Sequence, residues 1–139
     1  MTKYLTLYFS TGIVFWLLDF VWLGFVIKGF YLRELDGLLL PTPLMAPAIL
    51  FYLLYVIGIT VFAVVPALAS DSWLKALLLG ALLGSIAYGT YDLSNLATLK
   101  GWSPRFAMID IAWGATVTAV SATLGFWISR AITMRLPGT

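Results

Sequence analysis

The sequence contains no cysteine and no histidine among its 139 residues. These absences exclude disulfide bonds, Cys/His zinc sites, thiol nucleophiles and histidine as a general base. We therefore expect neither haem nor a Cys/His zinc centre, and no motif indicates another cofactor. Charge is also scarce, because eight Lys or Arg and six Asp or Glu leave a net charge of only +2. Without a basic block, the composition excludes a nucleic-acid partner.

Apolar residues dominate what is present. They make up 62% of the chain, and charged residues make up 10%, whereas soluble domains average roughly 45–50% and 25%. Too little polar surface exists to cover a water-soluble globule. The composition is typical of an integral membrane protein, with the lipid bilayer as its first partner.

Four segments are long enough to cross a hydrocarbon core, which needs roughly 20 apolar residues in a helix. They predict an all-α, four-transmembrane-helix bundle that forms a single transmembrane domain over residues 1–139. The second segment has only Tyr52, Tyr55 and Thr60 as its main polar residues, and we interpret it as scaffold. The expected helices cover residues 4–27, 46–69, 74–99 and 104–134.

Capping residues mark the segment boundaries. Gly101 suits the left-handed position after the third helix, and Ser103 can cap the fourth helix with Pro104 at its first position. The connection over residues 28–45 is too short to span, and we expect it to lie on the surface or re-enter, with leucines 38–40 dipping into lipid. Three residues are candidate N-caps for the third helix: Ser70, Asp71 and Ser72.

The orientation stays open, because the positive-inside rule gives a tie of four charges against four. We expect a bacterial inner membrane. One side is expected to carry Lys3, Lys75, Arg130 and Arg135, and the other Lys28, Arg33, Lys100 and Arg105.

Small residues recur at four-residue spacing in the third and fourth segments. Such rows let membrane helices approach closely, so we expect tight packing between these two helices or their neighbours. A homodimer or homo-oligomer contact is also compatible with the rows. They comprise Ala76, Gly80 and Gly84 in one segment and Gly114, Thr118 and Ala122 in the other.

Three carboxyl groups lie inside the expected helices, where a charge costs about 2.5–3.5 kcal/mol. At 1.5 Å per residue, Asp19 and Asp92 lie about 12–13 Å from the Lys28/Lys100 face and Asp110 about 7–8 Å from it. All three therefore lie in the same half of the membrane and are expected to face the bundle interior. A short hairpin connection should bring Asp92 and Asp110 together, and two such carboxylates cannot both stay ionised without compensation.

Polar and aromatic residues accompany these carboxyls and predict an acidic, aromatic-lined pocket. A purely structural role, in which the polar groups hydrogen-bond the helices together, is the alternative. If a metal ion binds, its ligands are expected to be Asp19, Asp92 and Asp110. The candidate substrate- or ion-binding residues are Asp19, Asp92, Asp110, Asn95, Tyr88, Tyr91, Trp22 and Trp113.

The stretch YDLSNLATLKGW over residues 91–102 is distinctive. It resembles the signature of a bacterial family of small predicted membrane proteins known only as a domain of unknown function. The resemblance extends over nearly the whole chain, including the regions of Asp19 and of Asp110 to Trp113. It implies a four-helix bacterial membrane protein and brings no activity, substrate or cofactor.

Three functions fit these observations. The first is a small transporter or ion- or proton-coupled carrier that uses the carboxylate cluster. The second is an integral membrane enzyme acting on a lipid or another apolar substrate, with Asp92 or Asp110 as acid/base assisted by Tyr88 or Tyr91. The third is an accessory subunit of a larger membrane complex. The sequence favours the carrier over the enzyme.

Overall fold

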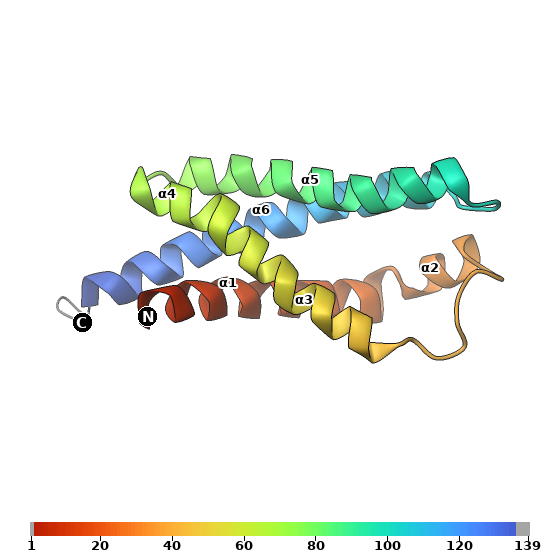
Figure 1. Cartoon of the computed structure of the whole chain (residues 1–139), viewed down its shortest axis with the longest axis horizontal. Helices are drawn as coiled ribbons and strands as arrows, with labels where there is room; N and C mark the ends of the chain where they lie inside the picture. Colours follow the sequence, from red (N-terminus) through yellow and green to blue (C-terminus); the bar gives the residue numbers. More distant parts are fainter. Residues whose placement is uncertain (1, 136–139) are drawn as a thin grey trace.

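The computed structural model describes residues 2–135, and it builds this part of the chain entirely from helices and their connections (Figure 1). Two spans contain a π-helical turn, labelled η. The elements in chain order are α1 (Thr2–Val21), η1 (Trp22–Val26), α2 (Lys28–Glu34), α3 (Met45–Ile59), η2 (Thr60–Val64), α4 (Val65–Ala69), α5 (Trp73–Thr98) and α6 (Pro104–Arg135).

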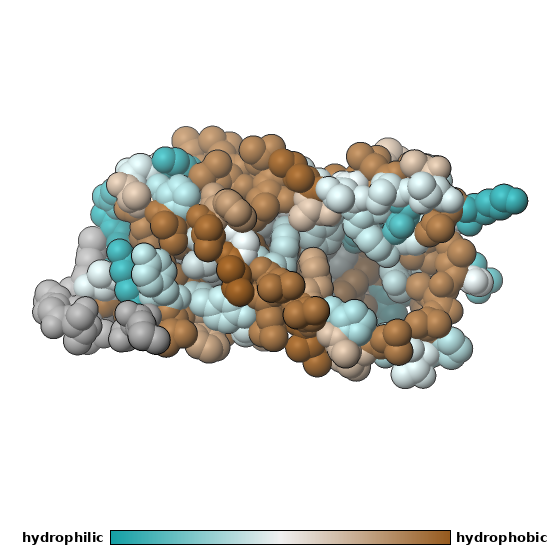
Figure 2. Space-filling view, viewed as in Figure 1, coloured by the Kyte–Doolittle hydropathy of each residue, from teal (hydrophilic) through white to brown (hydrophobic). Residues whose placement is uncertain are grey.

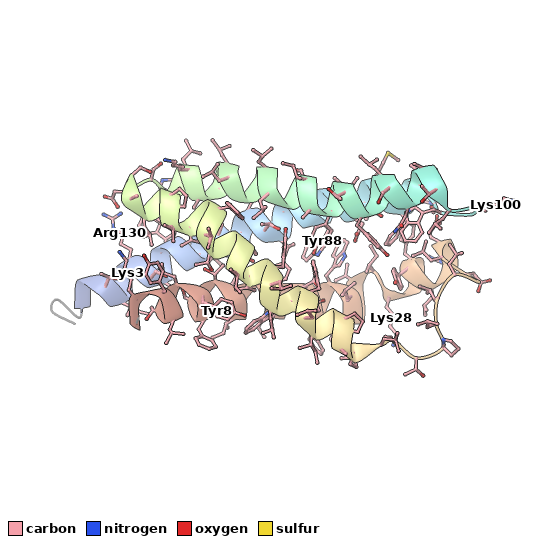
Figure 3. All side chains as sticks on the ribbon, viewed as in Figure 1. Lys3, Tyr8, Lys28, Tyr88, Lys100 and Arg130 are labelled. Atoms are coloured by element: carbon pink, nitrogen blue, oxygen red, sulfur yellow. The ribbon has the colours of Figure 1, made fainter. Side chains whose placement is uncertain are left out.

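Four helical stretches are long and apolar enough to cross a membrane: Lys3–Val26, Met45–Ala69, Trp73–Thr98 and Pro104–Thr133. They confirm the all-α, four-span architecture. Lys3 and Arg130 lie at one end of the bundle and Lys28 and Lys100 at the other (Figure 3). Apolar side chains make up much of the face between these ends that Figure 2 shows, as expected of a surface in contact with lipid. We call the end with Lys3 the terminal end and the opposite end the α2 end.

The caps that the sequence predicts are present. The Ser72 hydroxyl accepts a hydrogen bond of 3.3 Å from the Lys75 N–H at the start of α5. The Ser103 hydroxyl accepts one of 3.1 Å from the Phe106 N–H at the start of α6. Gly101 has φ +82°, a left-handed conformation that a side chain would strain. Gly101 and the Ser103 cap confine the α5–α6 connection to a tight turn.

Proline explains the π-helical turn in the second span. Pro66 is the second residue of α4, one residue beyond the end of η2. It has no N–H to donate, and its ring would clash with the carbonyl four residues earlier in a regular helix. Widening the preceding turn over Thr60–Val64 relieves both problems.

The small-residue rows of α5 and α6 face each other, which confirms the predicted close packing. A Cβ atom added to Gly84 would overlap the Gly114 carbonyl, and one added to Gly80 would lie 2.9 Å from Ala119 Cα. A third contact joins α6 to α1, where a Cβ on Gly125 would overlap the Thr11 side chain. Because these glycines have no side chain, atoms of the neighbouring helix can approach the backbone of α5 or α6 directly.

A continuous apolar core fills the terminal half of the bundle. Its fully buried side chains come from all four spans and include Leu7, Phe15, Val56, Ile59, Val64, Val117 and Phe126. Some polar groups within this half pair with one another, as the Ser10 and Ser129 hydroxyls do at 2.8 Å, whereas the buried Thr11 and Ser121 hydroxyls have no hydrogen-bond partner within residues 3–133. The terminal half is therefore filled mainly by packed apolar side chains.

The connection between the first two spans differs in part from the sequence prediction. It begins as the helix α2, and Leu35 is buried against Trp102, Phe106 and Ala107. The Ser103 hydroxyl donates a hydrogen bond to the Glu34 carboxylate. Leu38 and Leu40 are exposed, whereas Leu39 packs on the Leu35 cluster. The α5–α6 turn thus anchors this segment to protein rather than leaving all its leucines to lipid.

Candidate functional site

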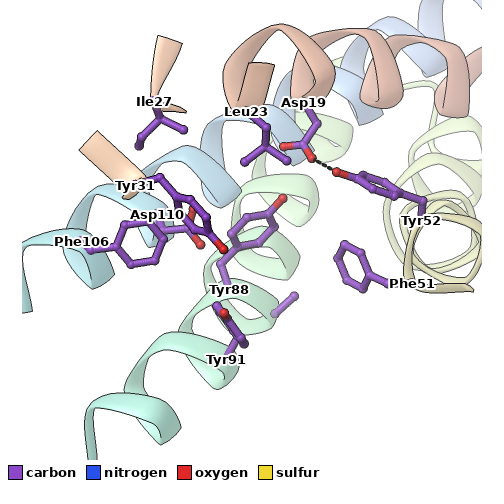
Figure 4. Close-up of a pocket in the computed structure, with 11 residues that line it drawn as sticks. Asp19, Leu23, Ile27, Tyr31, Phe51, Tyr52, Tyr88, Tyr91, Phe106 and Asp110 are labelled. Atoms are coloured by element: carbon purple, nitrogen blue, oxygen red, sulfur yellow. Dashed lines mark hydrogen bonds between the residues drawn. The ribbon is translucent and has the colours of Figure 1, made fainter. Parts of the chain in front are cut away.

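A cavity of about 400 Å³ lies in the α2 half of the bundle, between α1, α3, α5 and α6 (Figure 4). Its wall combines two carboxyl groups with six aromatic side chains and a few aliphatic ones. None of the described residues that line it is a Lys or Arg. The lining residues are Asp19, Leu23, Ile27, Tyr31, Phe51, Tyr52, Ala87, Tyr88, Tyr91, Phe106 and Asp110.

Asp19 is held by two donors from two other spans. The Tyr52 hydroxyl donates to one carboxylate oxygen at 2.5 Å, and the Trp113 indole N–H donates to the other at 2.9 Å. The Trp113 ring stacks on Trp22, with centroids 4.2 Å apart and planes 4° from parallel. Both oxygens of the Asp19 carboxyl therefore act as hydrogen-bond acceptors. The carboxylate is only 3% exposed and has no cationic partner among the described side chains.

Asp92 and Asp110 form a carboxyl pair beside Asp19. The two carboxyl groups are close enough to interact with each other, as the sequence predicts. Asp110 lines the cavity, whereas Asp92 is completely buried behind it. Trp102 is near Asp92, yet neither Asp92 oxygen reaches a partner with standard hydrogen-bond geometry. The pair therefore lacks the donors that Asp19 has.

Tyrosines line much of the remaining wall. Tyr88 lies between Asp19 and Asp110, while Tyr91 and Tyr31 flank Asp110 (Figure 4). Tyr31 belongs to α2, outside the spans, and burial raises the pKa of its hydroxyl, with the nearby Asp110 carboxylate adding to the increase. The Tyr31 hydroxyl is therefore a neutral donor at physiological pH. The cavity combines anionic acceptors with hydroxyls and aromatic faces.

The cavity opens sideways as well as lying near the α2 end. The α3 helix diverges from α5 toward this end, and the molecular surface is hollowed between them (Figures 1 and 2). Two half-exposed rings flank the opening, Phe51 at 45% and Tyr91 at 50% exposure. Toward the terminal end, the packed core closes it. A molecule dissolved in the bilayer can therefore reach the site without first passing through water.

The sequence-predicted residues divide into three groups. Asp19, Tyr88, Tyr91 and Asp110 line the cavity. Trp113, Trp22 and Asp92 stand behind it, in contact with those carboxyls or with one another. Asn95 does not line the cavity, and its side chain makes no hydrogen bond within residues 3–133.

The three aspartates do not converge as one ligand set. Across the described residues, no group of three or more Asp, Glu, His or Cys side chains is placed to hold a metal ion. The carboxyls instead divide into the donor-bound Asp19 and the Asp92–Asp110 pair. Asp19, Asp92 and Asp110, which the sequence predicts as the ligands of any bound metal ion, are thus neighbours with separate environments.

The second span contributes side chains to the cavity wall, in addition to the scaffold role that the sequence predicts for it. Tyr52 binds Asp19 and Phe51 lines the cavity, while the Tyr55 and Thr118 hydroxyls lie 2.8 Å apart. Two tyrosines in an otherwise apolar, charge-free helix were the available signal, since a buried phenol needs a partner. The remaining aromatic wall residues, Tyr31 and Phe106, carried no such signal.

These features define a class: a four-span integral membrane protein with an acidic, aromatic cavity in one half of its bundle. Its family is more particular. The chain belongs to the family of predicted membrane proteins known as domain of unknown function 2177 (DUF2177), which matches residues 4–127. The family resemblance expected from the sequence is confirmed. No curated protein and no solved structure matches the chain significantly.

Proposed function

We propose that this membrane protein is a proton-coupled carrier for an organic cation that it takes up from the bilayer. The observation that supports the proposal most directly is the composition of the cavity wall. Two carboxyl groups, four tyrosines and two phenylalanines surround about 400 Å³, and no cationic side chain compensates them. A cationic ligand supplies the missing charge.

Electrostatics favours a cation over an anion or a neutral ligand. A carboxylate removed from water is costly unless it is paired, and Asp19 has two neutral donors but no counter-ion. The faces of tyrosine and phenylalanine rings also attract an ammonium group, by about 2 kcal/mol or more when desolvated. An ammonium between Asp19, Tyr88 and Asp110 would gain from both interactions.

The Asp92–Asp110 pair supports the proton coupling. Two interacting carboxyls without a cation hold at least one proton between them, because both cannot be ionised in a low-dielectric interior. When a cation binds next to Asp110, the pair releases this proton, and the cation balances the additional negative charge on the carboxyls. Protonation in turn displaces the cation, so one site exchanges the two.

The shape of the cavity supports uptake from lipid. Release on the opposite side requires a second conformation in which the terminal half opens. The π-helical turns η1 and η2 lie within the first two spans, and such turns are common where membrane helices bend at functional sites. Since four helices enclose little volume, we propose that the carrier works as a homo-oligomer.

A membrane enzyme acting on a lipid is the second candidate. One observation favours it: the cavity opens toward lipid and is closed by the core on the other side. In that case Asp110 would transfer the proton, assisted by Tyr88. Product formation from a bound lipid, with no movement of cations, would distinguish the enzyme from the carrier.

The test uses the full chain in sealed proteoliposomes under a pH gradient. Uptake of radiolabelled alkylamines and tetraalkylammonium ions is measured together with lumenal pH. We expect cation movement in one direction and proton movement in the other, both lost in Asp110→Asn. Asp71→Asn is the matched control because Asp71 is exposed at the terminal end. Equal uptake by wild-type, Asp110→Asn and empty vesicles would refute the carrier.

A further inference from the structure

A second depression lies on the other side of Tyr52. This groove has a volume of about 690 Å³ and runs between the first span and the beginning of α3. It is almost entirely apolar, in contrast to the acidic cavity. Its lining residues are Trp16, Phe20, Leu23, Gly24, Pro43, Met45, Ile49, Tyr52 and Leu53.

The groove and the cavity share two wall residues, Leu23 and Tyr52. The Tyr52 side chain separates them, and its hydroxyl is bound to Asp19. A ligand whose charged group lies at Asp19 is therefore one side chain away from the groove. The polar cavity can therefore hold the headgroup of an amphiphile, and the adjoining apolar groove its hydrocarbon chain.

We propose that the groove holds the hydrocarbon chain of the same ligand, so that the substrate is a single-chain amphiphile with a protonated primary amine. This inference rests on the proposed function. The charge complement comes from Asp19 and Asp110, and the three N–H donors of an ammonium match carboxylate and tyrosine oxygens. Because the groove and the cavity share Leu23 and Tyr52, a ligand bound in the cavity can extend its hydrocarbon chain into the groove.

Depth argues against a phospholipid as the amine donor. Asp19 lies nine residues from Lys28, about 13 Å along the helix from the α2 end. A phospholipid headgroup stays near the membrane surface, because its phosphate and glycerol remain hydrated. A single-chain amine carries little else that needs water, so it can bring its charge to that depth once a carboxylate receives it.

Gly24 offers a direct test. It lines the groove but not the cavity, and a Cβ atom added to it would have no neighbour within 4 Å. A Gly24→Leu side chain therefore starts from a free Cβ position in the groove wall and takes up space in the groove. Gly58→Leu is the matched control, because a Cβ on Gly58 is equally free and Gly58 lines neither compartment. Ile49→Trp, at a half-exposed groove position, provides a second obstruction should Gly24→Leu not fold.

Binding of radiolabelled butylamine and dodecylamine is measured in lipid nanodiscs, with both expressed as mole fraction in the bilayer. We expect Gly24→Leu to weaken dodecylamine about tenfold or more, as loss of a hydrophobic subsite does. It should leave butylamine unchanged, and Gly58→Leu should change neither. Equal dodecylamine affinity in wild type, Gly24→Leu and Ile49→Trp would overturn the groove assignment, as would release of a tightly bound bilayer lipid from the groove variants alone. Failure of wild type to bind either amine would instead refute the proposed function.

Discussion

The indole N–H of Trp113 on α6 donates a hydrogen bond of 2.9 Å to the carboxylate of Asp19 on α1. This bond joins the first and last spans at the level of the cavity. Its geometry is fixed from the other side by Trp22, which stacks on the Trp113 ring. The same contact therefore stabilises the bundle and orients the carboxylate that we propose as the cation's partner.

Trp113→Phe should destabilise the protein by about 1–2 kcal/mol, because a buried carboxylate oxygen loses its donor while the ring stack is retained. Trp22→Phe is the matched control: it alters the other ring of the same stack, and the Trp22 N–H has no partner. Thermal unfolding in one detergent measures both. Equal losses would mean that ring packing, and not the hydrogen bond, holds Asp19.

The sequence predicted the four spans and their caps because those features depend on local properties. A run of apolar residues sets the length of a span, and Ser72, Gly101 and Ser103 act on adjacent backbone groups. The rows of small residues were also readable, since a four-residue period places them on one helix face. Which face meets which neighbour was clear only where a short turn forced α5 against α6.

Gly114→Ala should be among the most damaging single-methyl additions in the protein. The new Cβ would lie 2.1 Å from Tyr88 Cγ and 2.7 Å from Tyr88 Cβ, an atom that cannot move without moving the α5 backbone. Overpacking of this kind costs about 1–3 kcal/mol, occasionally more. Gly58→Ala supplies the control, since its Cβ is free and alanine favours the helix by up to about 1 kcal/mol.

Detergent-solubilised variants are compared by their unfolding temperature and by monodispersity on size exclusion. We expect a clear loss for Gly114→Ala and none for Gly58→Ala. An unchanged Gly114→Ala protein would mean that α5 and α6 separate readily, and close packing would no longer explain the glycine.

The candidate site was predictable in part, for a physical reason. A carboxyl in a membrane helix is conspicuous, so Asp19, Asp92 and Asp110 marked the correct half of the bundle. Tyr31 and Phe51 are unremarkable in sequence, and they enter the wall only because α2 packs against α6 and α3 diverges from α5. Which residues line the wall depends on how the helices cross, and no local periodicity of the sequence predicts that crossing.

Asp92→Asn should fold normally but lose proton coupling. Asp92 is fully buried without a standard hydrogen bond, and an amide of the same shape removes the interaction between the two carboxyls. Asp110 would then have no second carboxyl with which to share a proton, so cation binding should persist and release fewer protons. Calorimetric titration of an alkylamine in two buffers of different ionisation enthalpy measures this release. Undiminished proton release from Asp92→Asn would contradict the shared-proton pair.

The link between Ser103 and Glu34 should control the α2 end of the cavity. Ser103 caps α6 and also donates to Glu34, which holds α2 and hence Tyr31 in the wall. Ser103→Ala should cost about 1 kcal/mol as a lost N-cap and should additionally increase hydrogen exchange across residues 28–40, weakening alkylamine binding. Ser72→Ala removes only the cap of α5, so it should cost a similar free energy of unfolding without affecting that segment. If exchange over residues 28–40 rises equally in both variants, global destabilisation rather than the Glu34 link explains it, and the assignment of α2 as a wall held by Ser103 fails.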